Sequence, residues 1–254
     1  MVMAGTSDAR KIIKGLSITD NHVLATTISV NGADLARASG ADEVLVGRFD
    51  SSKLSEIIKT HEIDVMIDAT HPFASEATKN AINASDKEGI RYLRFDRPTL
   101  YIPENNLVHK VNSFKEAVDE IIKLGEGRIF HLAGVMTLHN LTDRIYPQRI
   151  VARILPTKFS IEKCLEAGLP IENIVAMQGT YSKEFNKALM DEYDISMVVT
   201  KESGKSGGTP SKLEAALELG IDIIMVMRPE IRELRDKTVF KNVDDLVMEV
   251  KKLE

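Results

Sequence analysis

Small and hydroxyl-bearing residues follow several short apolar runs of this sequence, and such residues can bind anions at the ends of parallel strands. Gly5-Thr6-Ser7 follows Met1–Met3 and Ala4, and Thr27 and Ser29 end a β-branched run. Glycines let backbone N–H groups approach an anion closely, and the N-terminus of a following helix adds partial positive charge. These loops are therefore candidates for holding the phosphates of a nucleotide cofactor.

The first loop by itself is a weak signal, because Thr6 or Ser7 would serve equally well as a helix cap. The dinucleotide fingerprint G-x-G-x-x-G is not met, since Ala4 and Asp8–Arg10 occupy places where glycines are usually sought. The loop needs support from elsewhere in the sequence before it can be assigned.

The second predicted strand gives that support and indicates which dinucleotide binds. NAD-binding proteins usually place an acid about 20 residues after the loop, where it binds the ribose 2′-hydroxyl. Here Thr26–Gly32 contains Thr27 and Ser29 but no acid, and Arg48 follows Gly47 in the next strand-end loop. Hydroxyls and arginine accept a 2′-phosphate that an acid would repel, so the sequence favours NADPH over NADH.

The segment Asp68–Ala74 (DATHPFA) follows another predicted strand and carries a histidine beside a proline. The candidate cofactor contacts on this loop are Ala69, Thr70, His71 and Pro72. His71 could donate a proton, contact the nicotinamide or a substrate carboxylate, or hold the turn through its own hydrogen bonds; the positioning role is the favoured one. The other histidines lack metal-ligand spacing with cysteine or acids, so we predict no metal site.

Basic residues at the ends of further predicted strands are candidate ligands for carboxylates. The candidates are Arg94, Arg97, Arg153, Lys201, Lys212 and Arg228. Each could equally be an ordinary solvated charge, but convergence on a cleft between two domains would suit a ligand with several carboxylates, which arginine binds through two parallel hydrogen bonds. Ser203, Gly204 and Gly207 belong to the glycine-rich loop Lys201–Gly208, which lacks the G-x-x-x-x-G-K-[ST] order of a P-loop.

The composition excludes several classes of protein. With 254 residues, 43% of them hydrophobic and 28% charged, the chain can bury a full core and more naturally two. A net charge of −5 gives no overall attraction to nucleic acid or to an anionic membrane. The sequence has neither the run of roughly 20 apolar residues that spans a membrane nor a signal-peptide pattern. A single cysteine, Cys164, rules out an internal disulfide and fits a reducing cytoplasm.

Strand-like and helix-like segments alternate along the chain at the short spacing of parallel α/β folds. In the first part the predicted strands are His22–Ser29, Glu43–Val46, Asp64–Asp68 and Tyr92–Phe95, and the predicted helices are Ser7–Leu16, Gly32–Ser39, Ser51–Thr60 and Ser75–Glu88. The segment Arg97–Asn106 has two prolines and no helical period, which indicates a linker. Beyond it the predicted helices are Ser113–Leu124, Ser160–Ala167, Lys183–Glu192, Ser211–Leu219 and Val243–Leu253, and the predicted strands are Arg128–Leu132, Arg149–Leu155, Ile174–Met177, Ser196–Thr200 and Asp222–Met227. We predict two Rossmann-like, doubly wound parallel-sheet domains, residues 1–100 and 101–254, with a cleft between them.

In their order along the chain, these motifs resemble those of the precorrin-6A reductases of corrin-ring biosynthesis, including the cobalt-precorrin-6A form. The motifs are Gly5–Arg10 (GTSDAR), Asp68–Ala74 (DATHPFA), Arg94–Pro98 (RFDRP), Arg153–Pro156 (RILP), Gln178-Gly179, Thr200–Gly204 (TKESG) with Gly207-Gly208, Lys212 and Ala215-Ala216, and finally Arg228-Pro229. The resemblance covers nearly the whole chain. The DATHPFA and KESG segments are its specific parts.

The resemblance implies an NADPH-dependent oxidoreductase of cobalamin biosynthesis, with the cofactor on the first domain and a polycarboxylate tetrapyrrole on the second. It implies hydride transfer from the nicotinamide to a ring double bond of precorrin-6A or its cobalt form, followed by protonation of the adjacent carbon. His71 or a bound water is the candidate proton donor. Transient contact with other enzymes of the corrin pathway is compatible with this role. Two alternatives stay open, a non-catalytic NADP(H)-binding sensor and a tetrapyrrole methyltransferase, although no loop for S-adenosylmethionine is evident.

Two departures from the family pattern concern the first loop. The family commonly begins with Gly-Gly-Thr, whereas Ala4 stands here in place of the first glycine. Met1–Met3 is also short for a central strand of about five or six residues. Either the coding start lies upstream, or the first strand is abbreviated and pairs more weakly.

Overall fold

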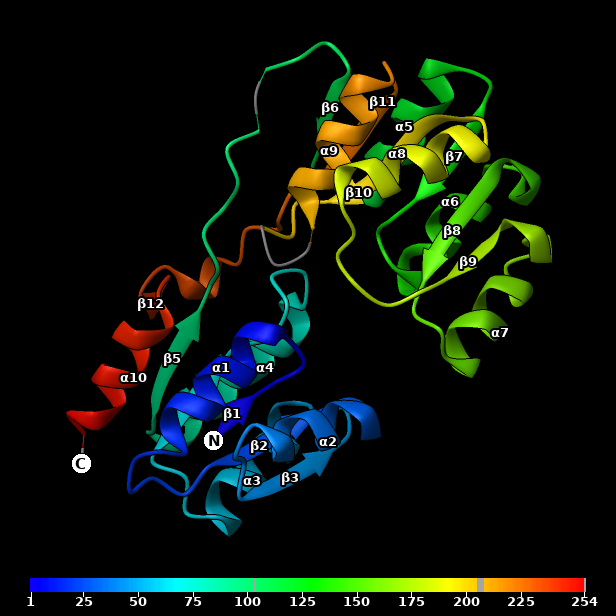
Figure 1. Ribbon diagram of the computed structural model, residues 1–254. Helices are drawn as coiled ribbons and strands as arrows, with labels where there is room; N and C mark the ends of the chain where they lie inside the picture. Colours follow the sequence, from blue (N-terminus) through cyan, green and yellow to red (C-terminus); the bar gives the residue numbers. More distant parts are fainter. Residues whose placement is uncertain (103, 205–207, 254) are drawn as a thin grey trace. The chain divides into compact units, whose positions relative to one another are not determined.

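The computed structural model describes residues 1–102, 104–204 and 208–253, and the chain divides into two compact units (Figure 1). The first unit comprises Met1–Pro98 and Pro229–Glu254, and the second comprises Thr99–Arg228. Each unit is built around a six-stranded sheet whose strand pairs are all parallel. The prediction of two Rossmann-like parallel α/β domains is confirmed.

The sheet of the first unit is doubly wound around a very short central strand. Its strands, in spatial order, are β12 (Thr238–Phe240), β5 (Arg91–Phe95), β4 (Val65–Asp68), β1 (Val2–Met3), β2 (Leu24–Thr27) and β3 (Glu43–Val46). β1 has two residues, yet it pairs on both sides, with Val2 opposite Ala25 and Ile67. One face of the sheet carries α1 (Ser7–Leu16), α2 (Val30–Ala38) and α10 (Val243–Lys251), and the other carries α3 (Ser51–Thr60) and α4 (Ser75–Glu88). The strand order reverses between β1 and β4, which is where doubly wound sheets bind ligands.

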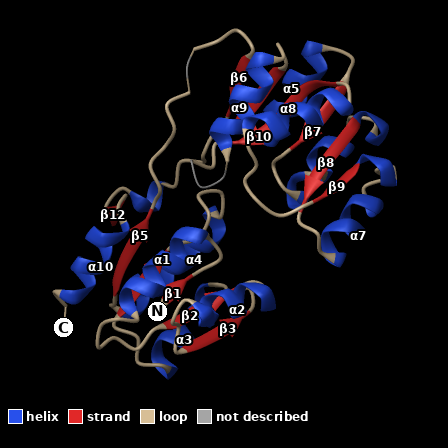
Figure 2. Ribbon diagram, in the orientation of Figure 1, coloured by secondary structure: helices blue, strands red, loops and turns tan. Residues whose placement is uncertain are grey.

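The sheet of the second unit repeats this order. Its strands, in spatial order, are β6 (Val108–Val111), β11 (Asp222–Val226), β10 (Ile195–Lys201), β7 (Arg128–His131), β8 (Ile150–Ile154) and β9 (Ile174–Ala176). Its helices are α5 (Phe114–Leu124), α6 (His139–Thr142), α7 (Lys158–Glu166), α8 (Lys183–Glu192) and α9 (Thr209–Glu218) (Figure 2). α8 and α9 share a hydrophobic core with one face of the sheet, α5 packs against β6 and β11, and α7 packs against β8 and β9. Here the strand order reverses between β7 and β10.

The C-terminal segment departs from the sequence prediction. β12 pairs with β5 and α10 packs against α1, so the chain from Pro229 onward belongs to the first unit and not to a domain of residues 101–254. The prediction missed this return because β12 has only three residues and its partner strand is distant in sequence. It also missed β6, whose four residues begin one residue after the predicted linker. The predicted boundary near residue 100 agrees with the division between Pro98 and Thr99.

Side-chain caps explain where most of the longer helices begin. Thr6 caps α1 by accepting the Ala9 N–H at 3.0 Å, and Asp50 caps α3 by accepting the Lys53 N–H at 2.8 Å. α4 and α9 differ, because they begin after Ala74 and Gly208 without a side-chain cap. Both helices follow loops that carry predicted site residues.

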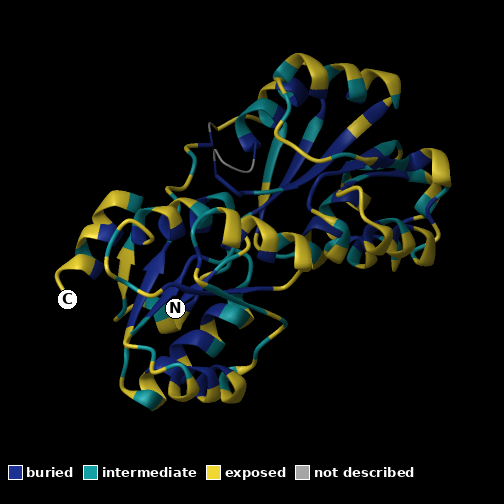
Figure 3. Cartoon of the chain, turned by 60° about the horizontal axis from the view of Figure 1, so that its bottom comes forward, coloured by how far each residue is buried: buried dark blue, intermediate teal, exposed yellow. Residues whose placement is uncertain are grey.

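Burial follows the layered architecture. The central strands of both sheets are buried on both faces, and the exposed residues lie mainly on the helices and loops (Figure 3). In the described part of the chain, no helix is both long enough and apolar enough to cross a lipid bilayer.

Candidate functional site

Two predicted loops of the first unit meet where its strand order reverses. The hydroxyl of Thr6 donates to the Ala69 carbonyl at 2.9 Å while also capping α1, which begins at Ser7. This bond ties the loop after β1 to the loop after β4. Gly5 has a φ of +125°, which favours glycine, and a Cβ built there would meet no atom within 4 Å. The space beside Gly5, where a side chain would lie, is therefore open.

The predicted residues after β2 and β3 also lie together. The Gly47 N–H donates to the Thr27 carbonyl at 2.8 Å, and the Thr27 hydroxyl donates to the Ser29 carbonyl at 3.1 Å. Ser29 is exposed and caps α2 by accepting the Gly32 N–H at 3.1 Å. Arg48, next to Gly47, is exposed. No acid lies among the residues from Thr26 to Gly32, as the argument for NADPH requires.

A buried carboxylate organises the loop after β4. Asp68, the last residue of β4, accepts the Thr70 N–H at 3.0 Å and the Thr70 hydroxyl at 2.7 Å on Oδ1, and the Tyr92 hydroxyl at 2.9 Å on Oδ2. The Arg94 guanidinium approaches the same Oδ1 at 2.8 Å. Burial raises the pKa of the Tyr92 hydroxyl, and the charge of Asp68 raises it further. Tyr92 therefore stays protonated and donates to Asp68.

Arg94 and Arg97, which the sequence suggested as substrate ligands, face acids of their own unit. The Arg94 residue is 1% exposed, and its Nη1 also lies 3.1 Å from the Thr70 hydroxyl and 3.4 Å from the Thr78 hydroxyl. The guanidinium of Arg94 is thus engaged within its own unit, and a direct contact of Arg94 with the substrate stays a prediction. Arg97 approaches the largely buried carboxylate of Asp8 at 2.9 Å. Asp8 lies in the first turn of α1, directly after the candidate phosphate loop.

His71 is partly exposed, and its orientation is set by the turn that contains it. Its Nδ1 accepts the Phe73 N–H at 3.2 Å, its ring lies 5.8 Å from the Phe73 ring, and its carbonyl accepts the Ala74 N–H at 2.8 Å. Pro72, between them, is buried. Because Nδ1 accepts a hydrogen bond, the neutral ring carries its proton on Nε2.

In the second unit, Arg153 and Lys212 form a largely buried pair of cations. Arg153, on β8, donates to Asn186 Oδ1 at 2.8 Å, and its guanidinium carbon lies 5.6 Å from the centre of the Tyr181 ring. Lys212, on α9, is 9% exposed. Burial, together with the nearby charge of Arg153, lowers the pKa of Lys212 to about 8. Desolvation also lowers the pKa of Arg153. The start of α9, without a side-chain cap and without an acid in its first turn, adds to the attraction for anions here.

Lys201 lies at the end of β10, on the side of the sheet that faces α5. Its Nζ lies 5.4 Å from the centre of the Phe114 ring, and burial lowers its pKa to about 8. His131, at the end of the neighbouring β7, is fully buried, and its Nε2 lies 3.1 Å from the Gly134 carbonyl. Burial, with a smaller contribution from the charge of Lys201, lowers the pKa of His131 to about 4, so His131 is neutral. Its buried Nδ1 has no hydrogen-bond partner among the described residues.

The loop after β10 is built around a second buried acid, Glu202. Its Oε1 accepts the N–H groups of Gly204 at 3.1 Å and Leu100 at 3.2 Å, and Arg228 pairs with its carboxylate. Ser203, also buried, lies with its Oγ 3.1 Å from the Thr209 hydroxyl. Arg228 is thus engaged in holding the loop, while Gly207 lies outside the described residues.

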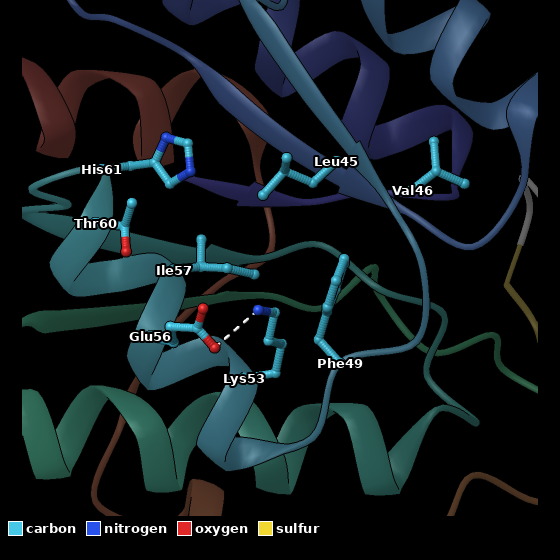
Figure 4. A pocket seen from close by; sticks show the side chains of 8 residues that line it. All are labelled: Leu45, Val46, Phe49, Lys53, Glu56, Ile57, Thr60 and His61. Atoms are coloured by element: carbon cyan, nitrogen blue, oxygen red, sulfur yellow. Dashed lines mark hydrogen bonds and ion pairs between the residues drawn. The ribbon is translucent and has the colours of Figure 1, made fainter.

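A hollow of about 240 Å³ lies between β3 and α3 in the first unit (Figure 4). Its lining residues are Leu45, Val46, Phe49, Lys53, Glu56, Ile57, Thr60 and His61. None of the predicted site residues is among them, and its Lys53 and Glu56 side chains pair with one another at 2.7 Å. The predicted site residues lie instead mainly at the carboxyl ends of the strands.

Sequence reasoning missed the acids that organise these loops. Asp68 and Glu202 stand inside the motifs that were singled out, but their buried partners are distant in sequence. The only available signal was an acid at the end of an apolar strand, where it must be paired if it is buried. His131 gave a similar signal, because it directly follows the apolar residues Ile129 and Phe130 of a predicted strand. In the described part of the chain, no group of three or more histidine, cysteine or acidic side chains is placed to hold a metal.

Comparison with known proteins assigns the family. The family model described as "Precorrin-6x reductase CbiJ/CobK" matches residues 1–251. Cobalt-precorrin-6A reductases of Methanothermobacter thermautotrophicus and Priestia megaterium are 46% and 39% identical to this chain, with 100% and 97% of this chain and 83% and 96% of the relatives covered. A solved structure described as CobK precorrin-6A reductase shares the fold, with a TM-score of 0.80 at 20% identity, over 99% of this chain and 95% of its own. The chain belongs to the precorrin-6x reductase family CbiJ/CobK.

Proposed function

We propose that this chain is an NADPH-dependent reductase that transfers a hydride to a ring double bond of precorrin-6A or its cobalt form. The product is the corresponding precorrin-6B, an intermediate of cobalamin biosynthesis. The observation that carries the proposal is the family match over residues 1–251, which includes the candidate loops of both units. The single cysteine, Cys164, is a free and buried thiol, which supports a reducing cytoplasm as the location.

The first unit is proposed to hold the cofactor. When bound, NADPH supplies the hydride from its dihydronicotinamide ring. The open backbone at Gly5 and the N-terminus of α1 support a pyrophosphate site at the first loop. Asp8 would repel a pyrophosphate there, but the Arg97 guanidinium neutralises its charge. Ser29 and the exposed Arg48 are proposed to hold the 2′-phosphate, which distinguishes NADPH from NADH.

The loop Ala69–Pro72 is proposed to contact the nicotinamide end of the cofactor. His71 can donate one hydrogen bond from Nε2, because its Nδ1 accepts the Phe73 N–H. We therefore propose that His71 positions the cofactor or substrate, and that the proton for the adjacent carbon comes from water.

The second unit is proposed to hold the carboxylates of the tetrapyrrole. Arg153 and Lys212 lie close to the uncapped start of α9, and Lys201 supplies another cation at the end of β10. A cation that has lost part of its hydration gains more from a bound carboxylate than a fully solvated one does. Because the hydride chemistry belongs to the cofactor, the main task of these residues is to fix the acceptor carbon against the nicotinamide.

Nicotinamide absorbance in the presence of enzymatically prepared substrate tests the proposal. We expect loss of NADPH absorbance only when precorrin-6A or its cobalt form is present, and a preference for NADPH over NADH. NADPH binding without oxidation, with both forms of the substrate supplied, would instead indicate the sensor function. A preference for NADH would contradict the proposed 2′-phosphate site at Ser29 and Arg48.

A further inference from the structure

We infer that Asp68, Tyr92 and Arg94 form a buried network that positions the loop Ala69–Ala74 for NADPH, and that Arg94 acts through this loop and not on the substrate. The inference rests on the proposed cofactor site. It gives Arg94 a role different from the one that its position in the sequence suggested.

The network connects the loop to three elements of the first unit. Asp68 ends β4, Tyr92 and Arg94 lie on β5, and Thr78 lies on α4. Oδ1 of Asp68 accepts both the backbone N–H and the hydroxyl of Thr70, so it fixes the backbone two residues beyond the strand. Arg94 Nη1 lies 2.8 Å from the same oxygen and 3.1 Å from the Thr70 hydroxyl. The position of Thr70 is therefore determined from two sides.

The same contacts set the start of α4 and the orientation of His71. α4 begins after Ala74 without a side-chain cap, and Arg94 Nη1 lies 3.4 Å from the Thr78 hydroxyl in its first turns. His71 follows Thr70 directly, and its Nδ1 is held by the Phe73 N–H within the same turn. A shift of Thr70 would turn the Nε2–H of His71 away from its ligand.

A positioning role explains why charges are retained at this place. Asp68 and Arg94 are 0% and 1% exposed, and a buried ion pair of this kind often contributes little to stability compared with apolar residues of similar size. The ion pair can instead fix the position of the loop, because a carboxylate accepts several hydrogen bonds at defined angles. A purely structural pair would be replaceable by apolar side chains without loss of function, and this difference can be tested.

The test uses three variants and measures NADPH binding without substrate. Arg94→Met removes the guanidinium. Asp68→Leu/Tyr92→Phe/Arg94→Met removes all three residues of the network, so that neither Asp68 nor Arg94 remains as a buried charge without the other; Asp96, which also approaches Arg94 at 3.7 Å, is partly exposed. Arg91→Met is the matched control, because Arg91 lies on the same strand but is exposed and pairs with Glu249 on α10. For each variant we would measure the NADPH dissociation constant by fluorescence, the thermal unfolding midpoint, and the KM for the tetrapyrrole at saturating NADPH.

We expect Arg94→Met and the triple variant to raise the NADPH dissociation constant about tenfold or more, since misplacement by about 1 Å is costly at a reacting site. We expect the KM for the tetrapyrrole to stay within about twofold, and Arg91→Met to bind NADPH like the wild type. A folded triple variant with wild-type NADPH affinity would overturn the inference, and so would a triple variant that does not fold. A raised tetrapyrrole KM with unchanged NADPH affinity in Arg94→Met would restore Arg94 as a substrate ligand. If the wild-type protein binds no NADPH, the proposed function itself fails, which is a separate result.

Discussion

Replacing Lys212 by methionine should make the protein more stable and its substrate binding weaker. The folded protein lowers the pKa of this ammonium from 10.5 to about 8, chiefly by burial. At about 1.4 kcal/mol per pKa unit, the charged form costs the folded state up to about 3 kcal/mol. Methionine keeps the apolar stem of the lysine and removes the charge. The figure is an upper limit, because the polar contacts of the ammonium are lost as well.

The pH dependence follows from the direction of the shift. Between pH about 8 and 10.5 the unfolded chain holds the Lys212 proton more strongly than the folded chain does, so wild-type stability rises with pH in this window. The stability gained by Lys212→Met is therefore full below pH about 8 and declines to nothing near the ordinary lysine value of 10.5. At neutral pH a gain of about 1–3 kcal/mol corresponds to a rise in Tm of roughly 3–9 °C for a protein of this size.

The substrate should respond in the opposite direction. Loss of one charge-assisted hydrogen bond to a carboxylate costs about 2–3 kcal/mol, so the KM for the tetrapyrrole should rise roughly 30- to 150-fold. Calorimetry and steady-state kinetics measure the two effects on the same preparation. The control is Lys115→Met, which changes an exposed lysine on α5 and should alter neither quantity.

Two results would refute this reasoning about Lys212. A lower Tm in Lys212→Met would show that the ammonium supports the fold, so that its burial has a structural cause. An unchanged KM would show that the cation does not contact the substrate, whatever its effect on stability. The combination of higher Tm and higher KM is the result that a desolvated ligand-binding cation predicts.

Three further predictions concern other residues. The value of kcat/KM for the tetrapyrrole should be level up to pH about 8 and fall above it, because Lys201 and Lys212 then lose the charge that binds carboxylates; a pH–rate profile that stays level well above this value contradicts the assignment. Thr6→Ala should lower stability by about 1 kcal/mol and weaken NADPH binding, whereas Thr6→Ser should preserve both, because the Thr6 hydroxyl caps α1 and bonds to Ala69. Calorimetry and NADPH titration measure the two effects, and equal behaviour of the two variants would contradict this role of the hydroxyl. Cys164 should react with a thiol reagent only as fast as the protein unfolds, because it is buried and burial raises its pKa to about 11; rapid labelling of the native protein contradicts this.

Much of the fold could be predicted because its signals are local. The helix Ser51–Thr60 starts with serines, which are common at helix starts, and has apolar residues at helical spacing; it is found with the same bounds, although Asp50 supplies the cap. The strand β12 could not be predicted, because three residues carry too little pattern and its exposed edge position imposes no apolar run. Its pairing with β5 is a tertiary contact with no local signature.

The contacts of the candidate site were also difficult to predict, because they too join residues that are distant in sequence. The motifs placed small residues and cations at strand ends, and the bond from Thr6 to Ala69 supports the idea that the first loop and DATHPFA belong together. The sequence could not distinguish an arginine that binds a ligand from one that pairs with an acid of the same unit. Arg94 pairs with Asp68 and Arg228 with Glu202, while Arg153 lies beside Lys212, and only burial and pairing in three dimensions separate these cases.

Transfer of label from the cofactor tests the central claim most directly. The protein would be supplied with NADPH deuterated at the reactive C4 position, together with precorrin-6A or its cobalt form, and the product examined by mass spectrometry and NMR. The proposed function predicts a reduced macrocycle that carries one deuterium from the cofactor and one hydrogen from solvent on the adjacent carbon. Recovery of both forms of the macrocycle unreduced, with the NADPH unconsumed, would contradict it.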